Sequence, residues 1–418
     1  MLKDILLSSS SNLSMTDLED NFGDYKLYGA TGFIKCIDFF DKDEEYIAIV
    51  KDGAGVGKSF LCDLKSSILS TLQYLTPKNK NNLKFSYYLL YNIHFEKYKV
   101  GSTIPHIYYK DYSKEKVFIP SIEEQRKIAN FLVNIDKKIN LLNQKQKLLR
   151  NFKKFCLQNI FSEDEKLRFK KTNGEIFPDW NSCILDDIFR SVKGKGLSKE
   201  KLDENGKYKC ILYGELYTKY DEIIKSVISK TNYDEGVLSE IGDILIPSST
   251  TTKGIDLVNA TAILEDNVRL GGDITILKKK NENIDSKYFA YYLSYGRTKE
   301  ISRLTQGSTI IHLYWEHLKK IPITVPCLKE QQKIVSNLLT IDKKLDFTQN
   351  QITEMENFKK GLLQEMFVYL ILYISIFLIL LFFKIILNKL EYYFIFHLFK
   401  VLEITDKGAY DLIDIILM

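Results

Sequence analysis

Apolar residues recur with helical spacing in two long stretches of the chain, residues 119–161 and residues 325–367. In each stretch they follow steps of four and three, a heptad pattern that is interrupted at Gln146 and at Thr348. A helix of about 40 residues is about 60 Å long. One apolar stripe must be buried, so the pattern predicts that the two helices pair as a coiled coil about a pseudo-twofold axis. The alternative is that each helix packs only on its own globular part. The apolar positions are Ile128, Leu132, Ile135, Ile139, Leu142 and Leu149, then Ile334, Leu338, Ile341, Leu345, Ile352, Met355 and Leu362.

The two stretches are copies of one another at an offset of 206 positions. Pro120 precedes the first helix, and Ser121 with Glu124 fits a capping box, whereas Cys327 is a weaker cap in the second copy. The repetition indicates a tandem duplication of a unit of about 200 residues. Shared features are Pro120/Pro326, Glu124/Glu330, Gln125/Gln331, both IDKK runs, both NFKK runs, and GSTIPHIYY (101–109) facing GSTIIHLYW (307–315). With a two-residue adjustment, FSYYLLY (85–91) faces FAYYLSY (289–295), and LKDI (2–5) resembles LDDI (185–188).

The remainder of each copy has the pattern of a mixed α/β domain. Short β-rich runs, such as Tyr46–Val50, alternate with glycine-rich turns, and the aromatic segment 287–296 predicts a short helix. The fold class is therefore α+β. The expected order is a domain over 1–118, a helix over 119–161, a charged linker over 162–176, a domain over 177–324, a helix over 325–367 and a tail over 368–418. Other predicted strands are 243–247 and 273–277.

Composition narrows the class of protein without deciding it. Of 418 residues, 27% are charged and 45% are hydrophobic, which is typical of globular chains. The formal charge of +5 permits a nucleic-acid partner but does not establish one. Six scattered cysteines without a CxxC pair, and the absence of a signal-peptide pattern, favour reduced thiols in the cytoplasm.

The segment Asp52–Ser59 (DGAGVGKS) approaches the pattern of a phosphate-binding loop. That motif needs glycine where Asp52 stands, and a helix after it, whereas FLCDL (60–64) predicts a strand. Nucleotide binding is therefore disfavoured. Two interpretations stay open: a glycine-rich hairpin turn, or a loop whose backbone amides and lysine approach DNA phosphates.

Familiar catalytic and metal-binding motifs are absent from the sequence. The chain has no HExxH, no GxSxG and no Asn/Asp-Pro-Pro-aromatic motif. Only His106 and His312 occupy matched positions in the two copies, and each could contact DNA or cap a turn. We therefore predict no catalytic residue and no metal site.

The duplicated motifs resemble those of the DNA specificity (S) subunit of type I restriction-modification systems. The features that carry the resemblance are (I/V)-P-x-(I/L)-x-E-Q-x-K-I at 119–128 and 325–334, the GSTI element upstream of each, and FPDW with LDDI at 177–188. The segment 25–58 is also similar to a target recognition domain of that family. The resemblance covers about residues 2–367.

The resemblance implies a division of labour between this chain and its partners. Each α/β domain would be a target recognition domain that reads one half of a bipartite site in double-stranded DNA. The long helices would pair antiparallel and set the spacing of the domains. The chain would be non-catalytic and would dock methyltransferase (M) and restriction (R) subunits. S-adenosylmethionine, ATP and magnesium would be bound by those partners, and this chain would hold no cofactor.

DNA contact by such a domain combines lysines on phosphates with polar side chains on base edges. Two sets of residues are predicted to bind DNA: Lys51, Gly53, Gly55 and Lys58 in the first domain, and Lys193, Lys195, Thr251, Thr252 and Lys253 in the second. The GST elements are expected either at the joint between domain and helix or in the functional surface: Gly101, Ser102, Thr103, Gly307, Ser308 and Thr309. The basic face of the first helix is either solvated or contacts DNA or the methyltransferase.

Both ends of the chain depart from the family pattern. The first copy has no counterpart of FPDW (177–180), so we expect a slightly truncated start. Residues 367–383 read FVYLILYISIFLILLFF, and with the run to Leu387 they are long enough to span a membrane. The tail is a membrane anchor, a packed helix or, as we favour, a product of frameshift or read-through. The alternative function is a membrane-associated protein-binding module.

Overall fold

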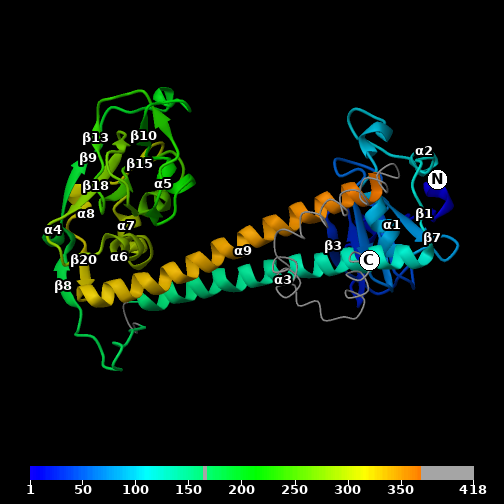
Figure 1. Ribbon diagram of the computed structural model, residues 1–418, viewed down its shortest axis with the longest axis horizontal. Helices are drawn as coiled ribbons and strands as arrows, with labels where there is room; N and C mark the ends of the chain where they lie inside the picture. The colour runs from blue at the N-terminus through cyan, green and yellow to red at the C-terminus, as the bar shows by residue number, and fades with distance from the viewer. Residues whose placement is uncertain (163–166, 369–418) are drawn as a thin grey trace, which may run out of the picture. The chain divides into compact units, whose positions relative to one another are not determined.

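The computed structural model describes residues 1–162 and 167–368, and these residues fall into two compact units. Unit 1 comprises Met1–Leu142 and the chain from Gln351, and unit 2 comprises Asn143–Asn350. The two long helices, α3 (Ile122–Ile160) and α9 (Leu328–Val368), each contribute residues to both units. Each unit therefore contains one α/β domain together with segments of both helices (Figure 1).

Unit 1 is built on a four-stranded antiparallel sheet in the order β1-β7-β4-β5. The residues of β4 (Tyr46–Val50) are all buried, as expected for a central strand rich in β-branched residues. The other strands of this sheet are β1 (Leu6–Ser10), β5 (Ser59–Cys62) and β7 (Leu72–Pro77), and a second sheet has the order β3 (Gly32–Ile37), β2 (Tyr25–Gly29), β6 (Ser66–Ile68). The helices are η1 (Leu2–Asp4), η2 (Thr16–Leu18), α1 (Leu83–Leu90), η3 (Phe95–Tyr98) and α2 (Tyr109–Tyr112).

Unit 2 repeats this plan with a larger sheet in the order β11-β16-β14-β18-β9. Its strands are β9 (Phe189–Lys193), β11 (Ile223–Ile224), β14 (Ile244–Pro247), β16 (Thr261–Ile263) and β18 (Ile274–Lys279). A second sheet has the order β12 (Lys230–Thr231), β10 (Tyr208–Ile211), β17 (Arg269–Leu270), β13 (Val237–Leu238). Two further sheets have two strands each: β15 (Ser249–Thr250) pairs with β19 (Ile311–His312), and β8 (Asn181–Ile184) pairs with β20 (Pro322–Val325). The helices are α4 (Leu185–Ile188), η4 (Lys199–Lys201), α5 (Glu215–Thr218), η5 (Gly254–Val258), α6 (Ser286–Tyr291), η6 (Tyr292–Gly296), α7 (Thr298–Arg303) and α8 (Trp315–Leu318).

The two sheets share a core of three strands, which confirms the duplication. In unit 1, β7 lies between β1 and β4, and in unit 2, β18 lies between β9 and β14, with antiparallel pairing throughout. The central strands β4 and β14 are both fully buried. The loops that follow them are therefore equivalent positions in the two domains.

The long helices begin directly after the predicted cap positions, Ser121 and Cys327. The segments assigned to them, 119–161 and 325–367, start three residues too early, since the helices begin at Ile122 and Leu328. This difference has a local cause, because proline at 120 and 326 disfavours helical backbone in the residue before it, and β20 continues to Val325. Ser121 Oγ accepts a hydrogen bond from the backbone N of Glu124 at 3.3 Å, as the predicted cap requires.

The alignment of the two aromatic helices also needs a correction, from a two-residue to a three-residue adjustment. Asn82 caps α1, and Asp285 caps α6. The backbone N of Asn82 donates to Gln125, and that of Asp285 donates to the matching Gln331. Tyr88 therefore corresponds to Tyr291.

Segments of α3 and α9 lie side by side within each unit. In unit 1, buried Leu132 and Ile135 share a hydrophobic cluster with Leu363. In unit 2, Gln146 Nε2 donates to Gln349 Oε1 at 2.6 Å, and Lys153 Nζ lies 2.8 Å from Asp342 Oδ1. Because a step forward along α3 is matched by an equal step backward along α9, the segments run antiparallel in this unit.

The apolar tail falls almost wholly beyond the described residues, which end at Val368. The predictions for residues 369–418 therefore lie outside the structure. Across 1–162 and 167–368, no helix has both the length and the apolar character of a membrane span.

Candidate nucleic-acid interface

The glycine-rich segment 51–58 forms the turn of a hairpin between β4 and β5. The backbone N of Val50 donates to Lys58 O, and that of Gly57 donates to Val50 O, both at 2.9 Å. Gly57 has φ +88°, and a Cβ there would meet the Phe95 side chain at 2.7 Å, so glycine is required. A strand follows the turn, as predicted, which does not fit a phosphate-binding loop.

The GST element of unit 1 lies against this turn. The backbones of Val100 and His106 exchange hydrogen bonds of 2.9 and 2.8 Å, which close a small hairpin with exposed residues at its tip. The backbone N of Gly53 donates to Pro105 O at 2.8 Å, and His106 Nδ1 lies 2.7 Å from Asp52 Oδ1. Two predicted groups, separated by about 50 residues in sequence, therefore form one surface.

Unit 2 builds the equivalent surface with different residues. Ser249 pairs with His312 across β15 and β19, and the backbones of Gln306 and His312 close a second GST hairpin. The ring of His312 stacks on that of Tyr314, with centroids 5.7 Å apart. Position 249 follows β14 as position 52 follows β4, so an acid–histidine pair in unit 1 corresponds to a serine and a stacked histidine in unit 2.

The predicted lysines of unit 2 lie at the same end of the sheet. Lys193 ends β9 opposite Thr275, is largely exposed, and lies 3.9 Å from Asp273 Oδ1. The backbone N of Ser248 donates to Asp273 O at 2.7 Å, which brings the segment 248–253 to the same edge. Lys195 follows in the same loop and is exposed.

The remaining predicted residues differ in how free they are to contact a ligand. Thr251 and Lys253 are exposed, whereas the Thr252 hydroxyl is engaged with Asp256. In unit 1, Lys58 Nζ lies 5.1 Å from the centroid of the Phe60 ring, and Lys51 pairs with Asp52 at 3.6 Å. A Cβ at Gly55 would have no neighbour closer than 3.7 Å, so this glycine is not demanded by packing.

The GST residues lie at the tips of these hairpins, and other residues tie each domain to its long helix. Gln125, buried at the start of α3, accepts from the backbone N of Asn82 at 2.9 Å and donates to Asn81 Oδ1 and Pro120 O, both at 3.0 Å. Gln331 accepts from the backbone N of Asp285 at 2.8 Å and donates to Asn283 O and Pro326 O at 3.1 and 2.8 Å. The repeated Glu-Gln pair was the available signal, but the pattern alone did not reveal this role of the glutamines.

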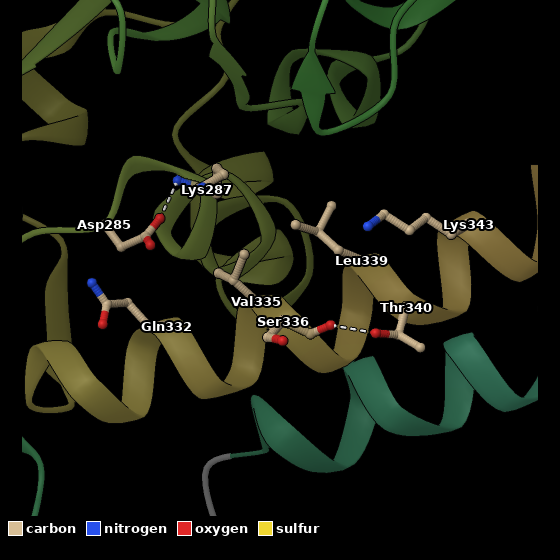
Figure 2. Close-up of a pocket in the computed structure, with 8 residues that line it drawn as sticks. All are labelled: Asp285, Lys287, Gln332, Val335, Ser336, Leu339, Thr340 and Lys343. Atoms are coloured by element: carbon tan, nitrogen blue, oxygen red, sulfur yellow. Dashed lines mark hydrogen bonds between the residues drawn. The ribbon is translucent and has the colours of Figure 1, made fainter.

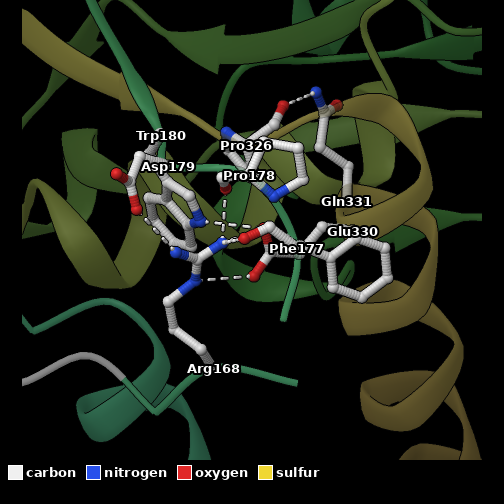
Figure 3. Close-up of polar contacts among 8 residues, drawn as sticks. All are labelled: Arg168, Phe177, Pro178, Asp179, Trp180, Pro326, Glu330 and Gln331. Atoms are coloured by element: carbon white, nitrogen blue, oxygen red, sulfur yellow. Dashed lines mark hydrogen bonds and ion pairs between the residues drawn. The ribbon is translucent and has the colours of Figure 1, made fainter. Parts of the chain in front are cut away.

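The neighbouring Glu330 is fully buried and belongs to an ion-pair network (Figure 3). Arg168 donates from Nε to Oε1 at 3.1 Å and from Nη2 to Oε2 at 2.9 Å, and Trp180 Nε1 donates to Oε2 at 3.0 Å. Arg168 Nη2 also donates to the carbonyls of Phe177 and Pro178. The hydrogen bond to Glu330 raises the pKa of Arg168. The charged linker predicted over 162–176 is therefore anchored to α9 by one of its own residues.

Within residues 1–162 and 167–368, no group of His, Cys, Asp or Glu side chains has the arrangement of a metal site. The exposed edge in each unit instead offers lysine ammonium groups, hydroxyls and loop backbone. These groups suit recognition of phosphates and of base edges.

The family model for the "Type I restriction modification DNA specificity domain" matches residues 1–151 and 178–357. The chain belongs to this family. The two matched segments correspond to the two copies of the repeat, and the second begins at the FPDW element.

Named relatives agree with this family. The chain is 28% identical over 341 residues to the type I restriction enzyme MjaVIII specificity subunit of Methanocaldococcus jannaschii, which covers 77% of this chain and 78% of the relative. It is 26% identical over 324 residues to the putative MjaX specificity subunit of the same organism, covering 74% and 73%.

The fold is similar to that of a solved type I system S subunit from M. genitalium, with a TM-score of 0.59, 20% identity, and coverage of 88% and 94%. A second similar structure, with a TM-score of 0.53 and 13% identity, comes from work on "complex assembly" of "the type I R-M system". It covers 87% of this chain and 95% of that chain. At these identities the likeness shows the fold.

Proposed function

We propose that this chain is the sequence-specific DNA-binding subunit of a type I restriction-modification complex. Each α/β domain reads one half of a bipartite site. The observation that supports this most directly is the repeated edge: in both units, the loop after the central strand is joined to a GST hairpin by backbone hydrogen bonds. The two domains have the same backbone arrangement at this edge but different side chains, as expected if they read different DNA sequences.

The proposed contacts divide into phosphate and base readout. Lysines at the edge, Lys51 and Lys58 in unit 1 and Lys193, Lys195 and Lys253 in unit 2, bind backbone phosphates. Gly53 and Gly55 admit the DNA backbone close to the protein backbone. The exposed hydroxyl of Thr251 contacts base edges or phosphates, and Thr252 holds this loop through its hydrogen bond to Asp256.

The long helices are proposed to pair as an antiparallel coiled coil that spaces the two domains. The antiparallel helix contacts within unit 2, and the shared Leu132/Leu363 cluster of unit 1, support this. The two interruptions of the heptad pattern are accommodated, since Gln146 bonds Gln349, and buried Thr348 donates to Lys344 O at 2.7 Å.

Methyltransferase and restriction subunits are the proposed protein partners, and catalysis is proposed to belong to them. S-adenosylmethionine, ATP and magnesium would then be bound outside this chain, in a cytoplasmic complex. One of the similar structures comes from work on complex assembly of the type I R-M system, and this is why we propose protein partners for this chain.

Two exposed features of unit 2 could receive such a partner. Three apolar side chains form a stripe on α3: Leu148, Phe152 and Phe155 are 68%, 54% and 57% exposed. A groove of about 390 Å³ lies between α6 and α9, with Val335 and Leu339 flanked by Lys287 and Lys343 (Figure 2). Exposed apolar surface of this kind is typical of protein interaction sites.

Methylome mapping of strains with and without this gene tests the proposal. Loss of one bipartite adenine-methylation motif on deletion is expected, and an unchanged methylome would contradict it. Fractionation tests the membrane-associated alternative, which predicts recovery only in detergent and no affinity for DNA.

The substitution Gly55→Ala tests the proposed edge directly. The added Cβ makes only ordinary van der Waals contacts within the protein, so stability should change little, whereas a DNA backbone in close approach would be displaced. Weaker binding to the cognate duplex with an unchanged melting temperature is expected. Gly361→Ala, where a Cβ on α9 meets open space away from this edge, is a control that should leave DNA binding unchanged.

A further inference from the structure

Two lysines at matched positions of the repeat each reach an aspartate on the other copy's helix. In unit 1, Lys359 Nζ of α9 lies 2.6 Å from Asp136 Oδ1 of α3. In unit 2, Lys153 Nζ of α3 lies 2.8 Å from Asp342 Oδ1 of α9. Both pairs join a lysine of an NFKK run to an aspartate of an IDKK run, so the repeat makes the same ion pair twice.

Each aspartate is also bonded to the aromatic helix of the α/β domain. Tyr88 of α1 donates its hydroxyl to Asp136 Oδ2 at 2.7 Å, and Tyr291 of α6 donates to Asp342 Oδ2 at 2.6 Å. The lysine ammonium lies 5.4 Å from the ring centroid of that tyrosine in both units. Lysine, aspartate and tyrosine thus form a clamp that joins the domain to both long helices.

The clamps are shielded enough for these contacts to matter. Both lysine side chains are only 17% exposed, and both tyrosine rings are buried. Burial, and next the hydrogen bond to aspartate, raise the pKa of Tyr88 and of Tyr291, so both hydroxyls stay protonated donors. Charged hydrogen bonds in such sites are stronger and more directional than exposed ion pairs.

We propose that these clamps are positioning devices for target recognition, and that each domain is held in its reading orientation by a lysine supplied by the opposite copy. The inference rests on the proposed function. Its consequence is a crossed dependence: the half-site read by the domain of unit 2 depends on Lys153, from the first copy, and the half-site read by the domain of unit 1 depends on Lys359.

A purely structural role would not produce this crossed pattern. Loss of overall stability lowers the amount of competent protein and affects both half-sites alike. A clamp that orients one domain affects discrimination at one half-site. The ratio of affinities for matched and mismatched half-sites therefore separates the two roles.

The experiment uses the full chain assembled with its methyltransferase subunits and three duplexes: the intact bipartite site from the methylome, and the same site with either half scrambled. Lys153→Met should lower discrimination at one half-site about tenfold and leave the other within about twofold. Lys359→Met should show the reverse. The adjacent exposed lysines supply matched controls, Lys154→Met and Lys360→Met, which should change neither.

Substitutions at two glycines show which half-site each domain reads. A Cβ at Gly57 would meet Phe95, and one at Gly194 would lie 2.0 Å from Gly271 O, so Gly57→Ala and Gly194→Ala disturb the loops of unit 1 and unit 2 respectively. Lys153→Met should affect the same half-site as Gly194→Ala. Tyr291→Phe, which keeps the ring and removes one hydroxyl, should give a smaller loss there and covers the case in which Lys153→Met does not fold.

Each result has a defined meaning. Equal loss at both half-sites, loss at the uncrossed half-site, or a lowered melting temperature with intact discrimination would overturn the clamp while the proposed function stands. A wild-type complex that does not distinguish the three duplexes would overturn both. Retained discrimination in Lys153→Arg, which keeps a cation next to Asp342 and Glu222, would support the clamp.

Discussion

The starts of the two long helices carry the same Glu-Gln pair, yet only the glutamine has the same role in both. Gln125 and Gln331 each accept one backbone hydrogen bond and donate two. Glu330 is fully buried between Arg168 and Trp180, whereas Glu124 is partly exposed, and no described side chain bonds its carboxylate. A repeated residue therefore keeps its role only where its partners are repeated too.

The two clamps differ in the same sense. Lys153 lies 3.3 Å from Glu222 as well as 2.8 Å from Asp342, and the hydroxyl of Tyr295 also bonds Glu222. Lys359 pairs with Asp136, and its ammonium faces the rings of Tyr88 and Tyr91. The clamp of unit 2 therefore contains one more acidic residue, Glu222, than the clamp of unit 1.

Glu330→Ala and Glu124→Ala should differ most in their effect on stability, because the two glutamates have different surroundings. Removing Glu330 leaves Arg168 and Trp180 without their shared acceptor in a buried site, so the free energy of unfolding should fall by about 3–5 kcal/mol. The same change at Glu124 should cost less than about 0.5 kcal/mol. Urea unfolding of both variants measures the difference, and equal losses would contradict the assigned roles.

Gln125→Ala and Gln331→Ala should show where the two units agree. Each substitution removes the partner of one partly buried backbone N–H and of two acceptors, so each should cost about 2–3 kcal/mol. The two losses should match within about 0.5 kcal/mol, as judged by chemical denaturation. Gln332→Ala, at the exposed neighbour, is the control, and a large loss there would point to a general effect on the helix.

Lys153→Met should destabilise the protein by about 2 kcal/mol and Lys359→Met by about 1 kcal/mol, because the first removes the cation partner of two carboxylates and the second of one. Burial lowers the pKa of Lys153, but attraction from Glu222 and Asp342 outweighs it and raises the pKa overall. Its contribution is therefore fully present below the unfolded lysine pKa of about 10.4 and is lost as pH rises through the higher folded value. The difference in melting temperature between Lys153→Met and wild type should therefore stay constant between about pH 6 and about pH 9. A decrease of this difference within that range would contradict this account.

Lys58→Ala should have the smallest effect on folding and a clear effect on DNA binding. Loss of one phosphate contact should reduce the slope of log affinity against log salt by about 0.9, with stability within about 0.5 kcal/mol of wild type. Lys3→Ala is the control, since Lys3 precedes β1 at the opposite end of the sheet. Fluorescence anisotropy over a salt series gives both slopes, and an unchanged slope for Lys58→Ala would remove it from the proposed interface.

Much of the fold could be predicted because its signals are local. Strand β4 coincides with the predicted run Tyr46–Val50, and both long helices were located within about three residues. The candidate DNA-binding loops could be predicted because glycine is typical of turns and lysine is typical of phosphate contacts. The aromatic helices were aligned one residue out of register, since tyrosines at adjacent positions fit either alignment and only the capping residues Asn82 and Asp285 distinguish them.

The sequence by itself determined the duplication, the helical and strand periods and the family, because repetition and periodicity are properties of neighbouring positions along one chain. Only the tertiary structure decided which charges meet. Arg168 reaches Glu330 across 162 positions, and Lys359 reaches Asp136 across 223. Such pairs form because folding brings these side chains together in places shielded from water, where an unpaired charge is costly. A sequence pattern shows the charges but not the shielding, so the two glutamates of one motif look alike until the fold separates them.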